Sequence, residues 1–265
     1  MTLDLHALRR AAEQAAYAAG QAAMRTFGSA HDETTKSGIY DIVTEGDRAS
    51  EAAILPILRA HSPYPILSEE GGGEEFESPY AWHLDPIDGT TNYANNLPHF
   101  SVSIALADRD LVPLVGVVLN PVTGELFSAA RGHGATLNGR PIHVSPSAHL
   151  NQCVVATGFP TGKRTLTDNN IDAFIAVLPR VRDVRRFGSA ALDLAFVAAG
   201  RFEAFWESNI HSWDVLAGLL LVTEAGGHVS DYDENTTHLY TGAQVMATNG
   251  HIHDALLLTV NNARR

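Results

Sequence analysis

Hydrophobic residues change their spacing along this chain, and the order of those changes restricts the folds open to it. Over residues 5–23 the apolar residues recur at helical spacing, which predicts a long amphipathic first helix. Thr44 and Asp47 have the pattern of a capping box that opens a second helix through Ala49–Leu58. Pro56 lies inside that helix and is expected to kink it or end it early.

The spacing then shortens to that of β-strands. Apolar or alternating runs predict strands at Ile66–Ser68, Ala81–Leu84, Phe100–Ala107 and Val112–Leu119. Asn138-Gly139 is a strong hairpin signal ahead of Pro141–Val144. From residue 153 onward, strand and helix patterns alternate, ending in a helix over His253–Val260. This order predicts one layered α+β and α/β unit over residues 1–265, with its seam near residues 145–152.

Charge and composition exclude several classes of partner. Thirty acidic and 18 basic residues give a formal charge of −12 without a basic stripe, so bulk attraction to nucleic acid is not expected. Apolar runs such as Val215–Val222 are shorter than the ~20 residues that cross a bilayer. The N-terminal stretch lacks the apolar block of a signal peptide. Cys153 is the only cysteine, which fits a reducing cytosol, so we expect a cytoplasmic protein with no membrane partner.

The most informative segment follows a predicted strand and reads Leu84-Asp85-Pro86-Ile87-Asp88-Gly89-Thr90-Thr91. The strand is expected to end at Asp85, Pro86 fixes φ for a tight turn, and Gly89 permits an unusual conformation or a close approach. The two aspartates can then converge on one point, with the Ile87 carbonyl between them. Backbone N–H groups from Gly89 onward open a short helix whose N-terminus suits a phosphate oxygen. The alternative is a surface turn with solvated carboxylates.

Two other acidic segments lie at an expected strand end or helix start. Ser68-Glu69-Glu70-Gly71 follows a strand, and Ser212-Trp213-Asp214 begins a helix. The alternatives are a solvated acidic loop, which we also expect over residues 71–77, and a carboxylate that only complements a helix dipole. Three acidic sites without thiolates favour Mg²⁺, Mn²⁺ or Ca²⁺, and the histidines lack the paired helical spacing of a zinc site.

In their order and spacing, these motifs resemble those of the inositol monophosphatase family. The resemblance covers nearly the whole chain and rests on Asp41–Thr44 with Asp47, Ser68–Glu70, Asp85–Tyr93, Gly188–Ala191, Trp213–Gly218 and Glu224–Gly227. It implies a Mg²⁺-dependent, lithium-sensitive phosphatase of sugars and polyols that forms a homodimer. It also implies the layered αβαβα sandwich of the sugar phosphatases, with a metal-binding half over residues 1–147. Residues 148–265 would form a second half containing Asp214 and the substrate pocket.

The resemblance assigns the metal ligands. Glu69, Asp85 and the Ile87 carbonyl would hold a first Mg²⁺, and Asp85, Asp88 and Asp214 a second, with a looser third ion near Glu69 through water. Charge supports this assignment, because four carboxylates and a phosphate in one place repel one another without cations. Two Mg²⁺ cancel the four ligand charges and create a site for the phosphate. Such a metal pair, about 3.5–4 Å apart, serves in-line displacement by water.

The resemblance also assigns the remaining roles. Gly89 and Thr90 would cradle the phosphate, while Thr90 and Asp47 orient and deprotonate the attacking water, so that Glu69, Thr90 and Asp47 make up the catalytic group. Lys36 matches a basic position behind the ligands. The hydroxyls of the substrate would be held by Asp88, Ser189, Ala190 and Glu207.

The substrate is expected to be inositol 1-phosphate or a similar polyol phosphate. Asn92–Asn95 and Phe205–Glu207 resemble the inositol monophosphatase branch, although Ser68 stands where glycine is frequent. Glu207 could accept hydrogen bonds from substrate hydroxyls; the alternative is an exposed acid at a strand end. Other candidate substrates are fructose 1,6-bisphosphate, histidinol phosphate, NADP and adenosine 3′,5′-bisphosphate. A mainly regulatory interaction protein is the other alternative, and the complete set of expected metal ligands favours the phosphatase over it.

Overall fold

The computed structural model describes residues 3–29, 34–38, 41–71, 77–236 and 244–264, with only the backbone described for residues 34–38 and 41. The helices are α1 (Leu5–Thr26), α2 (Glu45–His61), α3 (Thr90–Ala94), α4 (Ile171–Val177), α5 (Ala190–Ala198), α6 (Ser212–Glu224) and α7 (His253–Ala263). Short 3₁₀ turns cover Leu150–Gln152 and Leu178–Arg180.

Strands in the first half of the chain form a small sheet and a large one. A two-stranded sheet pairs β1 (Thr34–Gly38) with β2 (Asp41–Val43). The seven-stranded sheet contains, in spatial order, β3 (Ile66–Ser68), β4 (Tyr80–Asp88), β5 (Ser101–Asp108), β6 (Pro113–Asn120), β7 (Glu125–Ala130), β8 (Ala135–Leu137) and β9 (Arg140–Pro141). Strands β3 and β4 run parallel, and every later pair in this sheet is antiparallel.

Strands in the second half form a five-stranded sheet. Its spatial order is β11 (Asp183–Arg185), β10 (Val154–Thr157), β12 (Ala204–Ser208), β14 (Gln244–Thr248) and β13 (His228–Ser230). Strand β10 is parallel to both of its neighbours, whereas β14 is antiparallel to both of its own.

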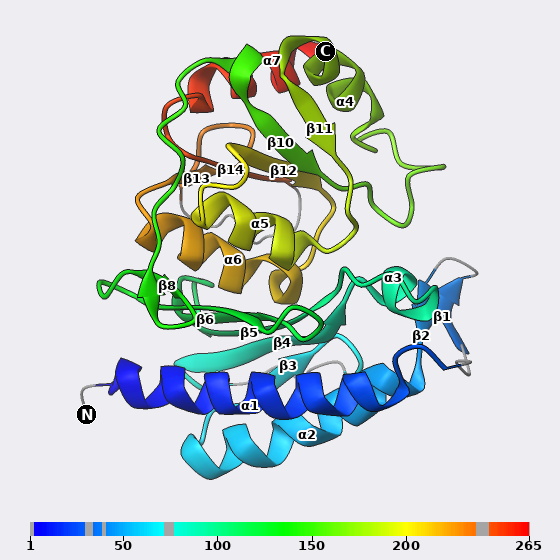
Figure 1. The fold of residues 1–265 in the computed structure, drawn as a ribbon, viewed down its shortest axis with the longest axis vertical. Coiled ribbons are helices and arrows are strands. Elements are labelled where there is room, and N and C mark those ends of the chain that lie inside the picture. The colour runs from blue at the N-terminus through cyan, green and yellow to red at the C-terminus, as the bar shows by residue number, and fades with distance from the viewer. Residues whose placement is uncertain (1–2, 30–33, 39–40, 72–76, 237–243, 265) are drawn as a thin grey trace.

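The elements stack in five layers (Figure 1). Helices α1 and α2 cover one face of the seven-stranded sheet, and α5 and α6 fill the space between the two large sheets. Helices α4 and α7 cover the outer face of the five-stranded sheet. The layered αβαβα sandwich expected from the sequence is therefore confirmed. Helix α6 packs against a sheet on either side, so it carries apolar residues on all of its faces, and residues 215–222 are all buried.

Helix α2 confirms one expectation and corrects another. Thr44 and Asp47 form the expected capping box, with the Thr44 hydroxyl accepting the Asp47 N–H and the Asp47 carboxylate accepting the Thr44 N–H. The expectation that Pro56 could end the helix early was wrong, since α2 continues through Pro56 to His61. Ile54 and Leu58 are fully buried against α1 and the sheet. That packing offsets the ~3 kcal/mol that an interior proline costs a helix.

Strand β4 differs from its prediction at the acidic segment. It does not end at Asp85 but continues to Asp88, with an irregular register against β5 between those two aspartates. Pro86 lies within this irregularity, where its missing N–H leaves no regular ladder position empty. The Asn138-Gly139 hairpin is confirmed, with Leu137 paired to Arg140 across it, although β9 is shorter than expected. Strands β1, β2, β7 and β13 were not expected from the sequence.

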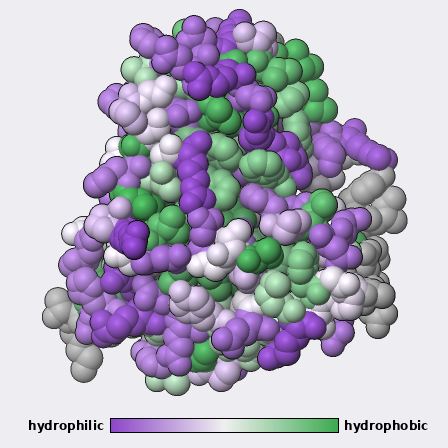
Figure 2. All heavy atoms as spheres, in the orientation of Figure 1, coloured by the Kyte–Doolittle hydropathy of each residue, from purple (hydrophilic) through white to green (hydrophobic). Residues whose placement is uncertain are grey.

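Most of the large apolar side chains are buried, and one group of them is exposed. Figure 2 shows hydrophilic residues over much of this face and a hydrophobic patch at its upper right, over α4. Ile171, Ile175 and Leu178, on α4 and the turn that follows it, are 41%, 61% and 45% exposed. Among the described helices, none is both long and apolar enough to cross a membrane.

Candidate active site

Three aspartates from two elements converge between the sheets. Asp85 and Asp88 end β4, and Asp214 lies in the first turn of α6. One carboxylate oxygen from each lies within 4.8 Å of the others. Asp85 and Asp88 are buried, and Asp214 is half-buried. The sequence prediction that the Asp-Pro turn and the Ser-Trp-Asp segment would form one acidic group agrees with this placement, against the alternative of solvated carboxylates.

Burial and mutual repulsion make this group unfavourable as three bare anions. Burial raises the pKa of Asp85 well above its usual range, and the carboxylates of Glu69, Asp88 and Asp214 raise it further. Burial likewise raises the pKa of Asp214, with Asp88 and Glu69 adding to the shift. A divalent cation bound between the carboxylates would lower their pKa values and offset their mutual repulsion. Carboxylate oxygens are the ligands that Mg²⁺ and Ca²⁺ prefer, so the residues present fit a hard metal ion.

Asp88 is held in place by the start of α5. Its Oδ2 atom accepts hydrogen bonds from the Ser189 hydroxyl at 2.6 Å, the Ala191 N–H at 2.8 Å and the Ser101 hydroxyl at 3.4 Å. Burial raises the pKa of Asp88 to about 6, and the bonds from Ser189 and Ala191 oppose that rise. The hydroxyl of Ser189, which was expected to bind substrate, therefore donates its hydrogen bond to Asp88 and helps to orient that carboxylate.

The other two aspartates are fixed by their own backbone. Asp85 Oδ1 accepts the Ile87 N–H at 2.9 Å. Asp214 Oδ2 accepts the His211 N–H at 2.9 Å, which closes the N-terminal turn of α6. The His211 ring stacks on Trp213, with 4.7 Å between ring centroids. The carboxylates of Asp85 and Asp214 are thus oriented by contacts within their own segments.

Glu69 follows β3, whose end lies beside β4. Its backbone N–H donates to the Leu84 carbonyl at 3.2 Å, which extends the pairing of the two strands. Glu69 lies outside the group of three aspartates but lines both of the adjoining hollows described below. It is therefore placed to complete the ligand set from the β3 side.

The expected water-activating pair lies next to the aspartates. The Thr90 hydroxyl is 3.4 Å from Asp47 Oδ1 and 3.1 Å from the Ile87 carbonyl oxygen. Asp47 is fully buried, and its Oδ2 accepts the Thr44 N–H at 2.8 Å and the Thr44 hydroxyl at 2.6 Å. The capping box of α2 thus fixes one Asp47 oxygen and turns the other toward Thr90.

Gly89 makes the turn between β4 and α3. It has a left-handed φ of +99°, which favours glycine. A side chain there would also meet the Gly188 carbonyl oxygen at 2.9 Å. Gly89, Thr90 and Thr91 line the smaller hollow together with Asp85 and the other acids.

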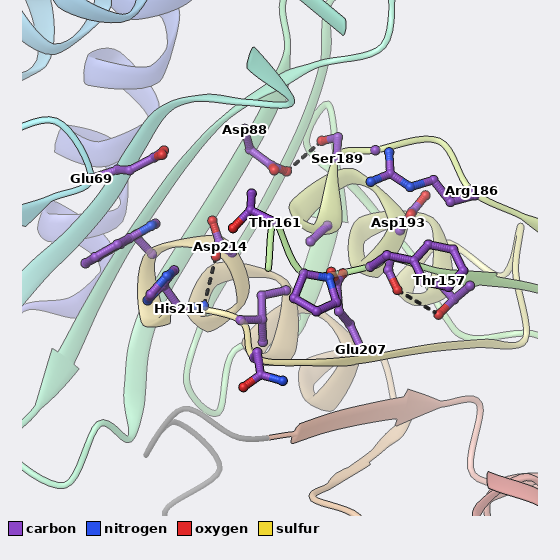
Figure 3. Close-up of a pocket in the computed structure, with 18 residues that line it drawn as sticks. Glu69, Asp88, Thr157, Thr161, Arg186, Ser189, Asp193, Glu207, His211 and Asp214 are labelled. Atoms are coloured by element: carbon purple, nitrogen blue, oxygen red, sulfur yellow. Dashed lines mark hydrogen bonds between the residues drawn. The ribbon is translucent and has the colours of Figure 1, made fainter. Parts of the chain in front are cut away.

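Two adjoining hollows share the acidic centre. The smaller, about 170 Å³, contains Asp85 and the Gly89 turn, and the larger, about 320 Å³, extends toward β10 and β12. Both are lined by Glu69, Asp88, Thr161, Arg186, Gly188 and Asp214. Figure 3 shows these acids on one side of the larger hollow and Glu207 on the other. The site is therefore elongated, with the acidic group at one end and a second polar group at the other.

The expected substrate residues line the larger hollow. Ser189, Ala190 and Glu207 all contribute to its wall. Glu207 is only 9% exposed, and burial raises its pKa to about 8 against the opposing charge of Arg186. The carboxylate packs so closely against Gly158 that a side chain at that glycine would overlap it. The alternative of an exposed acid at a strand end is therefore wrong.

Several lining residues were not identified from the sequence: Thr161, Arg186, Asp193 and His211. Asp193 carried a usable signal, because it is an acid within an otherwise apolar helix. Thr161 and Arg186 lie in connections whose position depends on the whole fold. Lys36 lies on β1, and its side chain is outside the described residues, as are residues 72–76 of the expected acidic loop.

Comparison with known proteins identifies the family. The sequence model of the inositol monophosphatase family matches residues 4–265. The chain belongs to the inositol monophosphatase family. Inositol-1-monophosphatase of Synechocystis sp. is 44% identical over 255 residues, which cover 96% of this chain and 88% of that protein. The solved structure of inositol monophosphatase from Anabaena (Nostoc) sp. has a TM-score of 0.89 and 42% identity, covering 98% of this chain and 97% of that chain.

Relatives with similar sequence identity to this chain have a different name. Nus factor SuhB of Escherichia coli (strain K12) is 38% identical over 261 residues, which cover 97% of each protein. Nus factor SuhB of Pseudomonas aeruginosa is 44% identical over 226 residues, 83% of each. Membership of this metal-dependent family supports a phosphatase, and the acidic cluster is suited to its metal.

Proposed function

We propose that the protein hydrolyses a phosphate monoester of inositol, or of a similar polyol or sugar, to the alcohol and inorganic phosphate. The observation that carries this proposal is the convergence of Asp85, Asp88 and Asp214 at one end of an elongated hollow whose other end holds Glu207. A site of this shape can hold a phosphate at the acidic end, once cations are bound, and hydroxyl groups at the other.

The metal sites are proposed to hold two Mg²⁺. Glu69, Asp85 and the Ile87 carbonyl would bind one, and Asp85, Asp88 and Asp214 the other, with a third ion near Glu69 through water. Bound cations supply positive charge that offsets the carboxylates and the phosphate, and acidity that lowers the pKa of water. The roles of the surrounding side chains follow from their contacts.

Water attack is proposed to depend on Thr90 and Asp47. The Thr90 hydroxyl, 3.4 Å from Asp47 Oδ1, can accept a hydrogen bond from the attacking water and relay its proton to that carboxylate. Asp47 remains oriented for this because Thr44 binds its other oxygen. The backbone N–H groups of Gly89 and Thr90 would hold the phosphate in line with the water.

Binding of the alcohol is assigned to the larger hollow. Glu207 can accept hydrogen bonds from substrate hydroxyls, and Asp88, Ser189 and Ala190 line the same hollow. Lys36 is proposed as a basic residue behind the metal ligands.

We further expect inhibition by Li⁺, a homodimer and a cytoplasmic location. The exposed apolar side chains of Ile171, Ile175 and Leu178 lie at helical spacing on one face, and a subunit contact would cover such a surface. Sedimentation of the purified protein tests the homodimer, since a monomer at micromolar concentration contradicts it.

Phosphate release from inositol 1-phosphate tests the proposed function. Wild-type protein should release phosphate with Mg²⁺ and stop when EDTA is added. Asp88→Asn should lose at least 100-fold in kcat, because Asp88 is both a proposed ligand and the acceptor of the Ser189 and Ala191 bonds. An Asp110→Asn variant, altered in the exposed turn after β5, is the matched control.

The name Nus factor for the Escherichia coli relative favours one second candidate, a regulatory interaction protein. The two candidates differ in what they require of the acids. A purely regulatory role survives Asp88→Asn, whereas hydrolysis does not. Complementation of a deletion strain by the Asp88→Asn variant would favour the regulatory role.

A further inference from the structure

Asp193 is a buried acid in the wall of the larger hollow. It lies on α5 between Leu192 and Leu194, in a helix whose other residues are apolar, and it is only 1% exposed. It lines the larger hollow but not the smaller one, so it lies away from the Gly89 turn and the proposed phosphate position. None of the roles assigned above involves this residue.

One oxygen of the Asp193 carboxylate has no hydrogen-bond partner among the described residues. This Oδ1 atom is buried and accepts no hydrogen bond. Native proteins satisfy most of their buried polar atoms, since an unsatisfied one costs stability, and exceptions are concentrated at functional sites. A buried carboxylate oxygen without a donor, in a residue that lines a pocket, is therefore explained best by a ligand that supplies the missing donor.

The charges around Asp193 indicate the kind of ligand. Burial raises the pKa of Asp193 well above its usual range; Asp88 and Glu207 raise it further and Arg186 lowers it, so these three residues lie near enough to interact with it. Figure 3 shows Asp193 and Glu207 on the side of the hollow opposite Glu69, with Arg186 next to Asp193. Two buried carboxyl groups can bind neutral hydroxyls, and they disfavour a second phosphate at the same position.

We propose that Asp193 is a specificity-determining residue, which binds a hydroxyl group of the alcohol together with Glu207 at the end of the hollow away from the phosphate. The proposal rests on the proposed phosphatase function and narrows its substrate class to polyols that carry a single phosphate. Esters with a second phosphate at the far end, such as fructose 1,6-bisphosphate, are disfavoured by the same pair of acids.

The test compares esters that differ at the far end. For wild type, Asp193→Ala and Asp193→Asn, kcat and KM are measured with inositol 1-phosphate, phenyl phosphate and fructose 1,6-bisphosphate. Asp193→Ala should lower the kcat/KM ratio of inositol 1-phosphate to phenyl phosphate by about 10-fold or more, chiefly through KM for the inositol ester. Asp193→Asn should recover part of that ratio, because its amide still binds hydroxyls. Asp172→Asn, in the first turn of α4 and outside the hollow, is the control.

Two further measurements separate the possible failures. Calorimetric titration with free inositol tests Asp193 even if no ester is hydrolysed: weaker binding by Asp193→Ala supports the proposal, and equal binding overturns it. Wild type that neither hydrolyses an ester nor binds inositol overturns both the proposal and the proposed function.

Thermal unfolding tests a purely structural role, since Asp193→Asn should unfold at the same temperature as wild type or a higher one. Two results contradict the proposal. One is a kcat/KM ratio for Asp193→Ala within twofold of that of wild type, and the other is an unfolding temperature of Asp193→Asn several degrees below that of wild type.

Discussion

Removing one negative charge from the acidic cluster should stabilise the protein when no metal is present. Asp85 is buried, and its pKa is raised by burial and by the carboxylates of Glu69, Asp88, Asp214 and Asp47. Asp85→Asn removes that repulsion but keeps an oxygen that can accept the Ile87 N–H, the bond that Asp85 Oδ1 makes at 2.9 Å. The variant should therefore be more stable than wild type in EDTA.

The magnitude follows from the spacing of the cluster. Two full charges no more than 4.8 Å apart repel by at least about 3 kcal/mol at an effective dielectric constant of ~20. Protons bound by the cluster reduce this repulsion. We therefore expect Asp85→Asn to raise the free energy of unfolding in EDTA by about 1–3 kcal/mol, and Tm by roughly 2–4 °C for each kcal/mol. Wild type should gain ~2.7 kcal/mol when Mg²⁺ is present at 100 times its Kd. Asp85→Asn should lose most of that gain.

Thermal unfolding of both proteins in EDTA and in a Mg²⁺ series measures the two effects. Asp110→Asn removes a charge from an exposed turn and controls for the change in net charge. Two results contradict the reasoning. One is an Asp85→Asn variant that is less stable than wild type in EDTA, and the other is a Mg²⁺ response as large as that of wild type.

Other residues give independent predictions. Thr90→Ala should lower kcat at least ~10-fold while Mg²⁺ still raises Tm, because the Thr90 hydroxyl contacts Asp47. Thr90→Ser keeps the hydroxyl and should restore activity. A kcat of Thr90→Ala equal to that of wild type would remove Thr90 from the mechanism. Ser189→Ala should weaken Mg²⁺ binding about 10-fold in calorimetry, since Asp88 loses a 2.6 Å hydrogen bond, and unchanged affinity would refute that role. Burial lowers the pKa of His253 to about 4, so the unfolded chain binds the extra proton first as pH falls from 6.5 to 4. The contribution of His253 to stability should fall by up to ~3 kcal/mol over that window, and denaturant unfolding of wild type and His253→Gln should show the difference between their pH dependences.

Local signals predicted the parts of the site that lie close together in sequence. The Thr44–Asp47 capping box and the Asp214 helix start each have a characteristic local pattern, and each was found where it was expected. The Asp-Pro segment has its acids where they were expected, but it lies within β4 and not in a turn after it. The three segments could be assigned to one site because acids at strand ends and helix starts share a chemistry. Their convergence within 4.8 Å was a consequence of the fold.

Tertiary packing decided what local signals could not. Pro56 stays inside α2 because Ile54 and Leu58 are buried on either side of it. Strand β4 passes through Pro86 because β5 continues beside it beyond the irregular register. The far wall of the larger hollow is assembled from β10, α5 and β12, which are distant in sequence, so the place of Asp193 in that wall could not be predicted from its own helix.

Phosphate release from a panel of esters tests metal-dependent hydrolysis most directly. The panel contains inositol 1-phosphate, fructose 1,6-bisphosphate, histidinol phosphate, adenosine 3′,5′-bisphosphate and NADP, each with Mg²⁺ and with EDTA. We predict Mg²⁺-dependent release that is fastest with inositol 1-phosphate and ceases in EDTA. Release that continues in EDTA, or none from any ester while Mg²⁺ still raises Tm, would contradict the proposed function.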